Sequence, residues 1–426
     1  MGGGDSTVGN PVSDFFLDNP VKLDDPFPDL AWLREHRPVH RHEPIGQWFV
    51  FPYEDVRSLF SDARLSSNRM AGFVDAAPAG VRNELRSLVP YLERWLLMSD
   101  APEHNRLRGV LHKGFNARAI AALREPIEGA ANELLDHATQ SGRIDVAADY
   151  GFLLPAYVLS EFMGVHRQDR DQVVRWSVDF VDFFNLIPIT EDTTRRMVKS
   201  ATEMTSYTRE LLAERRAAPR EDFIGVMASA ADSGEPISDE EILGNVLLIL
   251  IAGHVAVRNL IGNVIWLLLA HPAESERLRA DPGLLSGTVE ESLRYEPPIT
   301  LIPRIAREEI VIRDQTIRVG EIVQLSIVAA NRDPAQFSDP DRFDIGRDPR
   351  GALSFGHGPH GCLGARLARE QTLVALELLF RRFGTRFELE DPTAVRWYRN
   401  AGNRGPENLP ILFHRGTSPG SAAAES

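Results

Sequence analysis

The sequence predicts a mainly α-helical single domain with a smaller β portion. Apolar residues recur at helical spacing from Arg82 to Ala270. One helix in this region, Ile237–Ala270, would be roughly 50 Å long at ~1.5 Å per residue. After Pro297 the pattern changes to short β-type runs separated by turn residues. Because no internal repeat or low-complexity linker divides the chain, we expect one large domain.

The helices are predicted from apolar residues three and four positions apart. Besides a helix from about Tyr53, these stretches are Pro102–Phe115, Ala117–Thr139, Leu153–Met163, Arg167–Phe184, Thr193–Arg215 and Ile237–Ala270. The last begins with Ser238 and Glu241 in capping-box register and stops before Pro272. It is apolar on most sides, so it should lie in the core.

Short runs of β-branched and apolar residues predict the strands. They are Gln47–Phe51, Ile299–Ala306, Glu309–Arg313, Thr316–Val319 and Ile322–Val328. A glycine-rich loop, Phe355–Gly364, then leads into a helix from about Leu363 to Phe383.

Composition and charge exclude several classes of protein. The 426 residues are 43% hydrophobic and 25% charged, as in an ordinary globular protein. Residues 11–415 should form the domain, and the glycine-rich tails 1–10 and 416–426 should be disordered. The net charge of −14 makes nucleic acid or an anionic membrane an unfavourable partner. The most apolar segment, Ile242–Val257, is shorter than the roughly 20 residues that span a bilayer. We therefore expect a cytoplasmic protein that binds neither nucleic acid nor membrane.

The chain has a single cysteine, Cys362, which excludes an internal disulfide and a multi-cysteine zinc site. Glycines at 356, 358, 361 and 364 let the backbone pass close to a bulky flat group. Cys362 lies where a helix begins, and free N–H groups there stabilise a thiolate. Such a thiolate suits the axial position of an iron porphyrin. A lone cysteine is more often a small buried hydrophobic residue, but the patterned residues on both sides disfavour that interpretation.

The segment Phe355-Gly-His-Gly-Pro-His-Gly-Cys362-Leu-Gly364 resembles the haem-binding loop of the cytochrome P450 family, soluble bacterial type. The similarity extends from about Pro20 to about Pro410. It implies the single-domain P450 fold, with the long central helix over the haem. It also implies haem b (iron protoporphyrin IX), with Cys362 as the iron ligand and a catalytic residue.

The resemblance assigns further residues to the cofactor and to the fold. The residues expected to bind the cofactor are His104, Arg108, Arg304, Phe355, His360, Cys362 and Gly364. The four basic side chains among them would hold the haem propionates, because charge-assisted bonds to carboxylates suit them. Glu291 and Arg294, three apart on one helix face, would form a buried triad with Arg342.

The central helix departs from the family pattern. Ala252, Gly253 and His254 match it, but Val255 and Ala256 replace the acid and the threonine that pass protons to dioxygen. Neither replacement can donate a proton, so the usual relay at these catalytic positions is absent. His254 lies two residues before Ala256, and such positions do not share a helix face. We expect His254 to pack elsewhere.

Three explanations of this departure remain open. Substrate groups and ordered water could replace the relay, so that hydroxylation proceeds. Alternatively, hydrogen abstraction and radical coupling could form a C–N, C–C or C–O bond. Finally, the protein could be a haem-binding auxiliary or ligand-binding protein without turnover. Retention of Cys362 argues against the last explanation.

The resemblance also implies a substrate pocket and a redox partner. The substrate, a small natural product such as a secondary metabolite, would contact Phe180, Phe184, Leu250, Val255, Ala256, Ile299 and Leu301. Electrons would come from NAD(P)H through an external ferredoxin and its reductase. A basic patch could dock an acidic ferredoxin, and its residues are Arg106, Lys113, Arg366 and Arg369.

Overall fold

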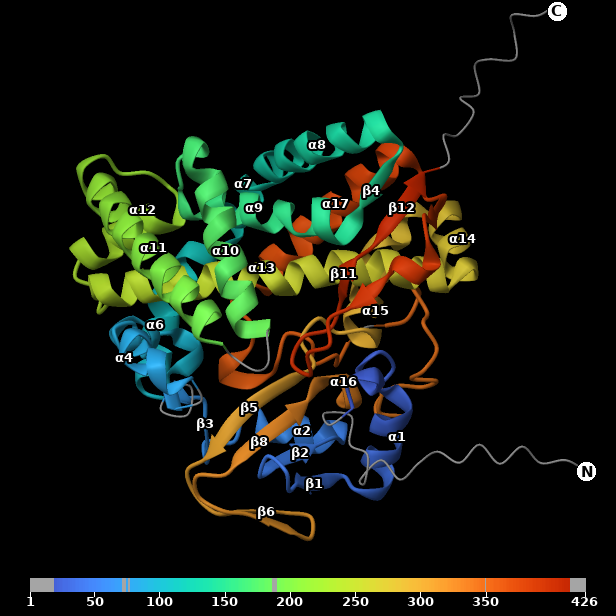
Figure 1. Ribbon diagram of the computed structural model, residues 1–426, viewed down its shortest axis with the longest axis horizontal. Coiled ribbons are helices and arrows are strands. Elements are labelled where there is room, and N and C mark those ends of the chain that lie inside the picture. Colours follow the sequence, from blue (N-terminus) through green and yellow to red (C-terminus); the bar gives the residue numbers. More distant parts are fainter. Residues whose placement is uncertain (1–18, 71–73, 76, 186–189, 349, 414–426) are drawn as a thin grey trace, which may run out of the picture.

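The computed structural model describes residues 19–70, 74–75, 77–185, 190–348 and 350–413. A helix-rich part and a β-rich part lie side by side, and the long helix α13 crosses the helix-rich part (Figure 1). The predicted tails, residues 1–10 and 416–426, lie outside the described residues.

The α-helices follow the apolar periodicity of the sequence. They are α1 Phe27–His36, α2 Tyr53–Leu59, α4 Arg82–Arg86, α5 Val89–Leu92, α6 Glu103–Leu111, α7 Ala117–Ala122, α8 Arg124–Ser141, α9 Leu153–Met163, α10 Arg170–Asn185, α11 Glu191–Ala217, α12 Phe223–Asp232, α13 Asp239–Ala270, α14 Pro272–Ala280, α15 Leu285–Tyr295, α16 Ile327–Ala330 and α17 Ala365–Phe383.

The strands are short and form several small sheets. They are β1 Val39–His42, β2 Gln47–Val50, β3 Leu65–Ser66, β4 Arg143–Asp145, β5 Leu301–Ala306, β6 Ile310–Ile312, β7 Gln315–Ile317, β8 Ile322–Ser326, β9 Phe387–Leu389, β10 Arg396–Trp397, β11 Pro406–Asn408 and β12 Pro410–Phe413.

The largest sheet has the strand order β1-β2-β8-β5-β3, in which β2 and β8 are parallel and the other neighbours antiparallel. A second sheet has the order β4-β12-β9, and β6–β7 and β10–β11 are two-stranded pairs. The pairing of β5 with β8 places Arg304 opposite Val323 and Leu301 opposite Ser326. The β portion is therefore assembled from segments far apart in the chain.

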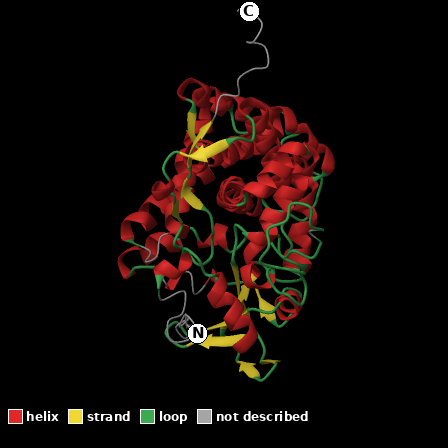
Figure 2. Cartoon of the chain, turned by 90° about the vertical axis from the view of Figure 1, so that its right-hand side faces the viewer, coloured by secondary structure: helices red, strands yellow, loops and turns green. Residues whose placement is uncertain are grey.

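The helix α13 organises the helix-rich part. The Ser238 hydroxyl accepts from the Glu241 N–H at 3.2 Å, and the Glu241 carboxylate accepts from the Ser238 N–H at 2.8 Å, which confirms the predicted capping box. The helix is long and apolar enough to cross a membrane by length and composition, but 61% of its most apolar window is buried in the protein. Figure 2 looks along α13, which lies end-on at the centre with other helices around it. It is the core helix that the sequence predicted.

The predicted helices and strands lie where the structure has them, but some of their ends and breaks differ. The stretch predicted as one helix, Ala117–Thr139, is broken at Leu123 into α7 and α8. Pro126 explains the break, because proline is tolerated in the first turn of a helix but not in its interior. The run predicted as strand Ile322–Val328 ends at Ser326, whose side chain caps α16. Helices α1 and α12 and strands β1, β3, β4 and β9–β12 are among the elements that were not predicted.

Candidate active site

The single cysteine lies in a loop whose backbone has a fixed shape. The Cys362 N–H donates to the Phe355 carbonyl at 2.8 Å. Gly356 and Gly358 have φ angles of +71° and +70°, a region that glycine occupies without strain. A Cβ at Gly358 would lie 2.2 Å from Ser61 Oγ. The loop therefore holds Cys362 in one orientation.

The environment of the thiol differs from the prediction in one respect. The Cys362 side chain is exposed, although enough protein surrounds it for burial to raise the pKa of its thiol. It therefore opens onto a space inside the protein, not onto bulk water. The Gly364 N–H and the charges of Arg108 and Arg369 act against this rise in pKa. The helix start does not by itself produce the expected thiolate, whereas a metal cation bound to the sulfur would.

The four basic side chains predicted to hold the propionates come together. The rings of His104 and His360 have centroids 4.0 Å apart. Burial, followed by the charges of His104, Arg304 and Arg108, lowers the pKa of His360 to about 3. Burial also lowers the pKa of Arg304 to about 10. The carboxylate of Asp100 is the counter-charge that acts on both groups. The two arginines are cations, and the two imidazoles, whose pKa values burial lowers, are neutral hydrogen-bond donors, so the cluster is suited to binding an anion.

Two members of this cluster lack the partners that buried polar groups normally have. His104 Nε2 is buried and has no hydrogen-bond partner. Arg304 is 3% exposed, and its guanidinium donates to the carbonyl of the adjacent Pro303 at 3.0 Å. Such groups carry a free-energy cost unless a ligand satisfies them. Two carboxylates at this point would satisfy both.

A haem therefore fits these residues, with its propionates at the cation cluster and its iron at Cys362. In the described ranges, no group of three His, Cys, Asp or Glu side chains is arranged to hold a metal ion. A single protein ligand is sufficient when the metal is already held in a macrocycle. Phe355, under the Arg369 guanidinium at 4.3 Å, and Gly364, near Phe115, would form the floor of this site.

A further cation of this cluster, Arg69, was not predicted from the sequence. Its guanidinium donates to the carbonyls of Ser67 and Pro303 at 3.2 and 3.1 Å, and burial lowers its pKa to about 10. The charge of Arg69 in turn contributes to the lowered pKa of Arg304. Arg69 follows a short strand and belongs to no motif, so nothing in the sequence pattern distinguished it.

One face of α13 carries small, partly exposed residues. Ala252 is exposed and Val255 and Ala256 are partly exposed, in a helix whose other sides are mostly buried. Gly253 lies beside this face and has a packing role, because a Cβ there would lie 3.1 Å from Leu159 Cδ2. Gly253 therefore allows α9 to pack closely against α13, and its expected catalytic role stays a prediction.

His254 packs elsewhere, as the sequence predicted. Its side chain is 1% exposed, and Nε2 donates to the Phe152 carbonyl at 2.6 Å. Burial lowers the pKa of His254 to about 4. The ring lies away from the face formed by Ala252 and Ala256, so it cannot replace their missing proton relay.

The predicted substrate contacts are brought together only in part. Ile299 is partly buried near the start of β5, beside Ile302. Leu250 is fully buried in the main core, on the side of α13 opposite Ala252, because residues two apart on a helix point in different directions. Leu301 packs in the cluster around Phe49, away from Ile302 on the alternating strand.

The aromatic side of the predicted pocket is also less open than expected. Phe180 is 2% exposed and belongs to the main core. The side chain of Phe184 lies outside what the structure describes. Leu250, Leu301 and Phe180 are thus buried in hydrophobic clusters, and the substrate contacts expected for Ile299, Val255 and Ala256 stay predictions.

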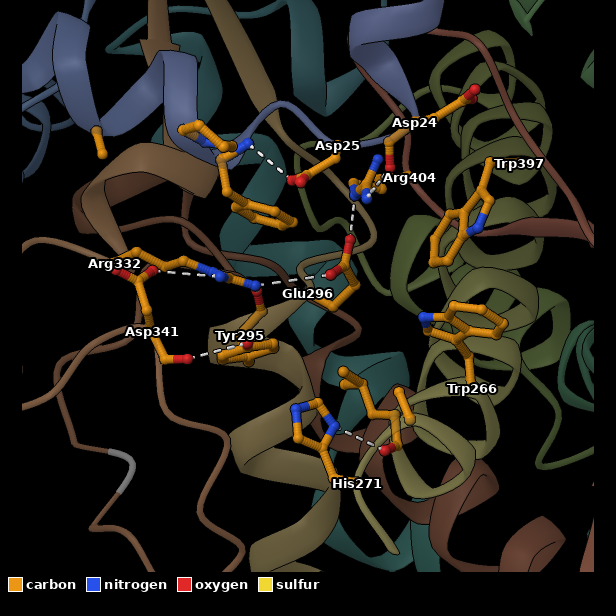
Figure 3. A pocket seen from close by; sticks show the side chains of 15 residues that line it. Asp24, Asp25, Trp266, His271, Tyr295, Glu296, Arg332, Asp341, Trp397 and Arg404 are labelled. Carbon is orange, nitrogen blue, oxygen red and sulfur yellow. Dashed lines mark hydrogen bonds and ion pairs between the residues drawn. The ribbon is translucent and has the colours of Figure 1, made fainter. Parts of the chain in front are cut away.

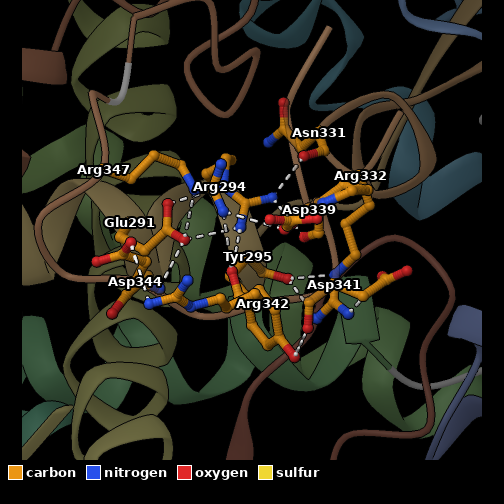
Figure 4. Close-up of polar contacts among 12 residues, drawn as sticks. Glu291, Arg294, Tyr295, Asn331, Arg332, Asp339, Asp341, Arg342, Asp344 and Arg347 are labelled. Carbon is orange, nitrogen blue, oxygen red and sulfur yellow. Dashed lines mark hydrogen bonds and ion pairs between the residues drawn. The ribbon is translucent and has the colours of Figure 1, made fainter. Parts of the chain in front are cut away.

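The buried ion cluster has a different third arginine from the predicted one. Arg294 donates to both oxygens of Glu291, at 2.7 and 2.8 Å, and all of these atoms are buried (Figure 4). The further cation is Arg347, whose Nε lies 3.1 Å from Glu291 Oε1. Arg342 contributes its backbone carbonyl to Arg294, while its side chain is 63% exposed and lies 3.7 Å from Asp344. The prediction of Arg342 was wrong because Arg347 reaches Glu291 from the same irregular segment.

Comparison with known proteins agrees with this geometry. The family model described as Cytochrome P450 matches residues 75–396. The mycinamicin IV hydroxylase/epoxidase of Micromonospora griseorubida is 37% identical over 388 residues, which cover 89% of this chain and 94% of that protein. The crystal structure of CalO2 superposes with a TM-score of 0.85 at 31% identity, covering 96% of this chain and 99% of that one.

A second solved structure is also similar, and its protein is described as an enzyme of bond formation, not of hydroxylation or epoxidation. The cytochrome P450 enzyme CxnD, described as acting in C–S bond formation in chuangxinmycin biosynthesis, has a TM-score of 0.79 at 35% identity. The alignment covers 91% of this chain and 94% of CxnD. Together with the cysteine loop and the cation cluster, these matches show that the chain belongs to the cytochrome P450 family, as one of its haem-dependent monooxygenases.

Proposed function

We propose that this monooxygenase binds haem b through Cys362 and oxidises a small, largely apolar natural product on the face formed by Val255 and Ala256. The observation that carries the proposal is the convergence of an exposed thiol with the buried cations around His360. When bound, the haem supplies the activation of dioxygen by two electrons.

The protein's own residues orient the cofactor and shape the reaction space. His104, Arg108, Arg304 and His360 would hold the propionates, which fixes the rotation of the macrocycle in its plane. The Gly364 N–H, which acts on the Cys362 sulfur, would tune the thiolate. Val255, Ala256 and Ile302 would exclude water and contact apolar parts of the substrate.

Two reaction types are compatible with these residues. Hydroxylation or epoxidation is supported by the similarity to an enzyme named for both reactions. Oxidative bond formation is supported by the similarity to an enzyme of C–S bond formation, and by Val255 and Ala256, which cannot pass a proton. The third explanation, a non-turnover auxiliary protein, is not retained, because the chain belongs to a family of monooxygenases and such a role gives no reason for an iron ligand such as Cys362.

The experiment that decides between them begins with binding. A panel of secondary metabolites is screened for a shift of the haem spin state in the holoenzyme. Each metabolite that binds is then incubated with dioxygen, NADPH and a surrogate ferredoxin and reductase. The masses of the products are measured by mass spectrometry. A product heavier by one oxygen indicates hydroxylation or epoxidation, and one lighter by two hydrogens indicates coupling or desaturation. Binding of a metabolite without any NADPH consumption would contradict both reaction types.

Electron delivery by a ferredoxin in the cytoplasm is part of the proposal. Three of the four basic side chains of the docking patch have carboxylate partners: Arg106 pairs with Glu241, Lys113 with Glu235, and Arg369 with Glu290. Arg366 is exposed. We therefore expect Arg366→Glu to slow reduction by ferredoxin several-fold at low salt and less at high salt. An unchanged rate in both conditions would remove Arg366 from the docking surface.

A further inference from the structure

A row of residues on one side of α13 runs from the proposed reaction face towards a second opening of the protein. Residues three and four apart share a helix face, so Ala256, Asn259, Asn263 and Leu267 lie in one line. Ala256 is partly exposed at one end, and Leu267 at the other end lines a pocket of about 450 Å³. Asn259 and Asn263 are both 0% exposed. The row spans roughly 15 Å at ~1.5 Å per residue.

The two asparagines have unsatisfied polar atoms. Asn259 Nδ2, Asn259 Oδ1 and Asn263 Oδ1 are buried and have no hydrogen-bond partner. A buried polar atom without a partner costs about 1–3 kcal/mol, and in native proteins such atoms are normally bonded to internal water. Asn259 lies against Gly405, whose missing side chain leaves it room, because a Cβ there would lie 2.6 Å from Asn259 Cγ.

The far end of the row reaches the pocket through backbone contacts. Asn263 Nδ2 donates to the carbonyls of Glu296 and Arg404, at 2.8 and 3.2 Å. Figure 3 shows Glu296 and Arg404 in this pocket, with Trp266 of α13 beside them. Asp341, which is also in the pocket wall, has a side chain that is 68% exposed. Asn263 is therefore one hydrogen bond away from two residues, Glu296 and Arg404, that line this pocket.

We propose that Asn259 and Asn263 hold a chain of buried water that carries protons from this pocket to the reaction face, in place of the acid and the alcohol absent at Val255 and Ala256. This inference rests on the proposed function. Each water in such a chain accepts one proton and donates another, so the amides stay neutral and pocket water is the source of the proton. No group other than solvent is consumed.

A matched control lies on the same helix. Asn245 is also 0% exposed, but its atoms are satisfied: Oδ1 accepts from the Leu96 N–H at 2.9 Å, and Nδ2 donates to the carbonyls of Arg94 and Glu241 at 2.8 Å each. Asn245→Leu removes hydrogen bonds, whereas Asn259→Leu removes a water site. The first should lower Tm by several degrees, and the second should change Tm by much less.

The test uses the holoenzyme with NADPH and a surrogate ferredoxin system, in H2O and in D2O. We expect Asn259→Leu to lower the rate of dioxygen consumption at least five-fold and to enlarge its solvent isotope effect. Asn259→Asp, which still binds water, should stay within two-fold of the wild type, as should Asn245→Leu per folded haem protein. An unchanged rate and isotope effect in Asn259→Leu would overturn the proposal.

A crystal structure of the wild-type holoenzyme gives a readout that does not depend on turnover. We expect ordered water within hydrogen-bonding distance of both side-chain atoms of Asn259 and of Asn263 Oδ1. The absence of ordered water beside these asparagine atoms would also overturn the proposal. If no variant, wild type included, consumes dioxygen while water occupies the row, then the proposed function fails and the water site stands.

Discussion

Arg347 Nε lies 3.1 Å from Glu291 Oε1, inside a cluster where Glu291 and Arg294 are completely buried. Arg347 also donates to the carbonyls of Ser338 and Asp339, at 2.6 and 3.0 Å. It thereby ties the irregular segment before the cysteine loop to α15. The ion cluster therefore fixes the irregular segment that precedes the cysteine loop.

Replacing Arg347 should destabilise the protein far more than replacing Arg342. Arg347→Ala removes a charge-assisted hydrogen bond to the buried Glu291, which keeps its pair with Arg294, and such a bond contributes about 1.5–3 kcal/mol. Arg342→Ala affects an exposed side chain and should cost about 0.5 kcal/mol or less. Urea unfolding of the two variants, followed by circular dichroism, measures both. Equal losses of stability would contradict the assignment of Arg347.

Arg304→Ala should weaken haem binding. The cation is buried without a carboxylate of its own, and a hydrogen bond to a charged group contributes about 1.5–3 kcal/mol. We therefore expect haem to dissociate about 10- to 100-fold faster, measured by transfer to excess apomyoglobin. Arg313→Ala, which removes an exposed arginine paired with Asp55, is the charge-matched control. The same dissociation rate in both variants would show that Arg304 does not hold a propionate.

His254 should make the protein sensitive to mild acid. Burial lowers its pKa to about 4, so the unfolded chain, with a pKa near 6.5, binds the proton first as the pH falls. The stability that neutral His254 contributes is complete above about pH 6.5 and is lost progressively towards pH 4. The loss amounts to about 3 kcal/mol at most. The free energy of unfolding in urea should fall less between pH 7 and pH 4.5 for His254→Gln than for the wild type. Equal falls in the two proteins would refute this prediction.

Returning the alcohol at position 256 tests whether its loss matters. A threonine hydroxyl there can donate and accept a proton, which Ala256 cannot. We expect Ala256→Thr to change the peroxide released per NADPH oxidised at least two-fold, measured with a peroxidase-coupled assay. Ala121→Thr, on an exposed face of α7, should leave this ratio unchanged. If Ala256→Thr also leaves the ratio of peroxide to NADPH unchanged, the residue at position 256 does not control proton delivery.

The sequence predicted the elements whose ends carry local signals. Ser238, Glu241 and Pro272 marked the ends of the central helix, and the structure has it at Asp239–Ala270. The glycines around Cys362 marked its loop in the same way. The four basic residues from three separate segments were found through a family resemblance, and the structure brings them together.

The third arginine of the ion cluster and the strand pairings depend on long-range contacts that sequence patterns do not encode. Arg342 and Arg347 belong to the same irregular segment, and only the path of the backbone decides which reaches Glu291. Strand pairing between distant segments, such as β4 with β12, was missed for the same reason. Leu250 is a different case, because helical geometry alone places it away from Ala252 and could have excluded it.

The central claim, that Cys362 is the iron ligand, is tested most directly by the absorption spectrum of the reduced carbon monoxide complex. The wild type should show the long-wavelength Soret band of a thiolate-ligated haem. Cys362→Ser should lose that band, while Ser61→Ala, a change beside the same loop, should keep it. Persistence of the band in Cys362→Ser would contradict the account, because no other cysteine is present in the sequence to supply the thiolate.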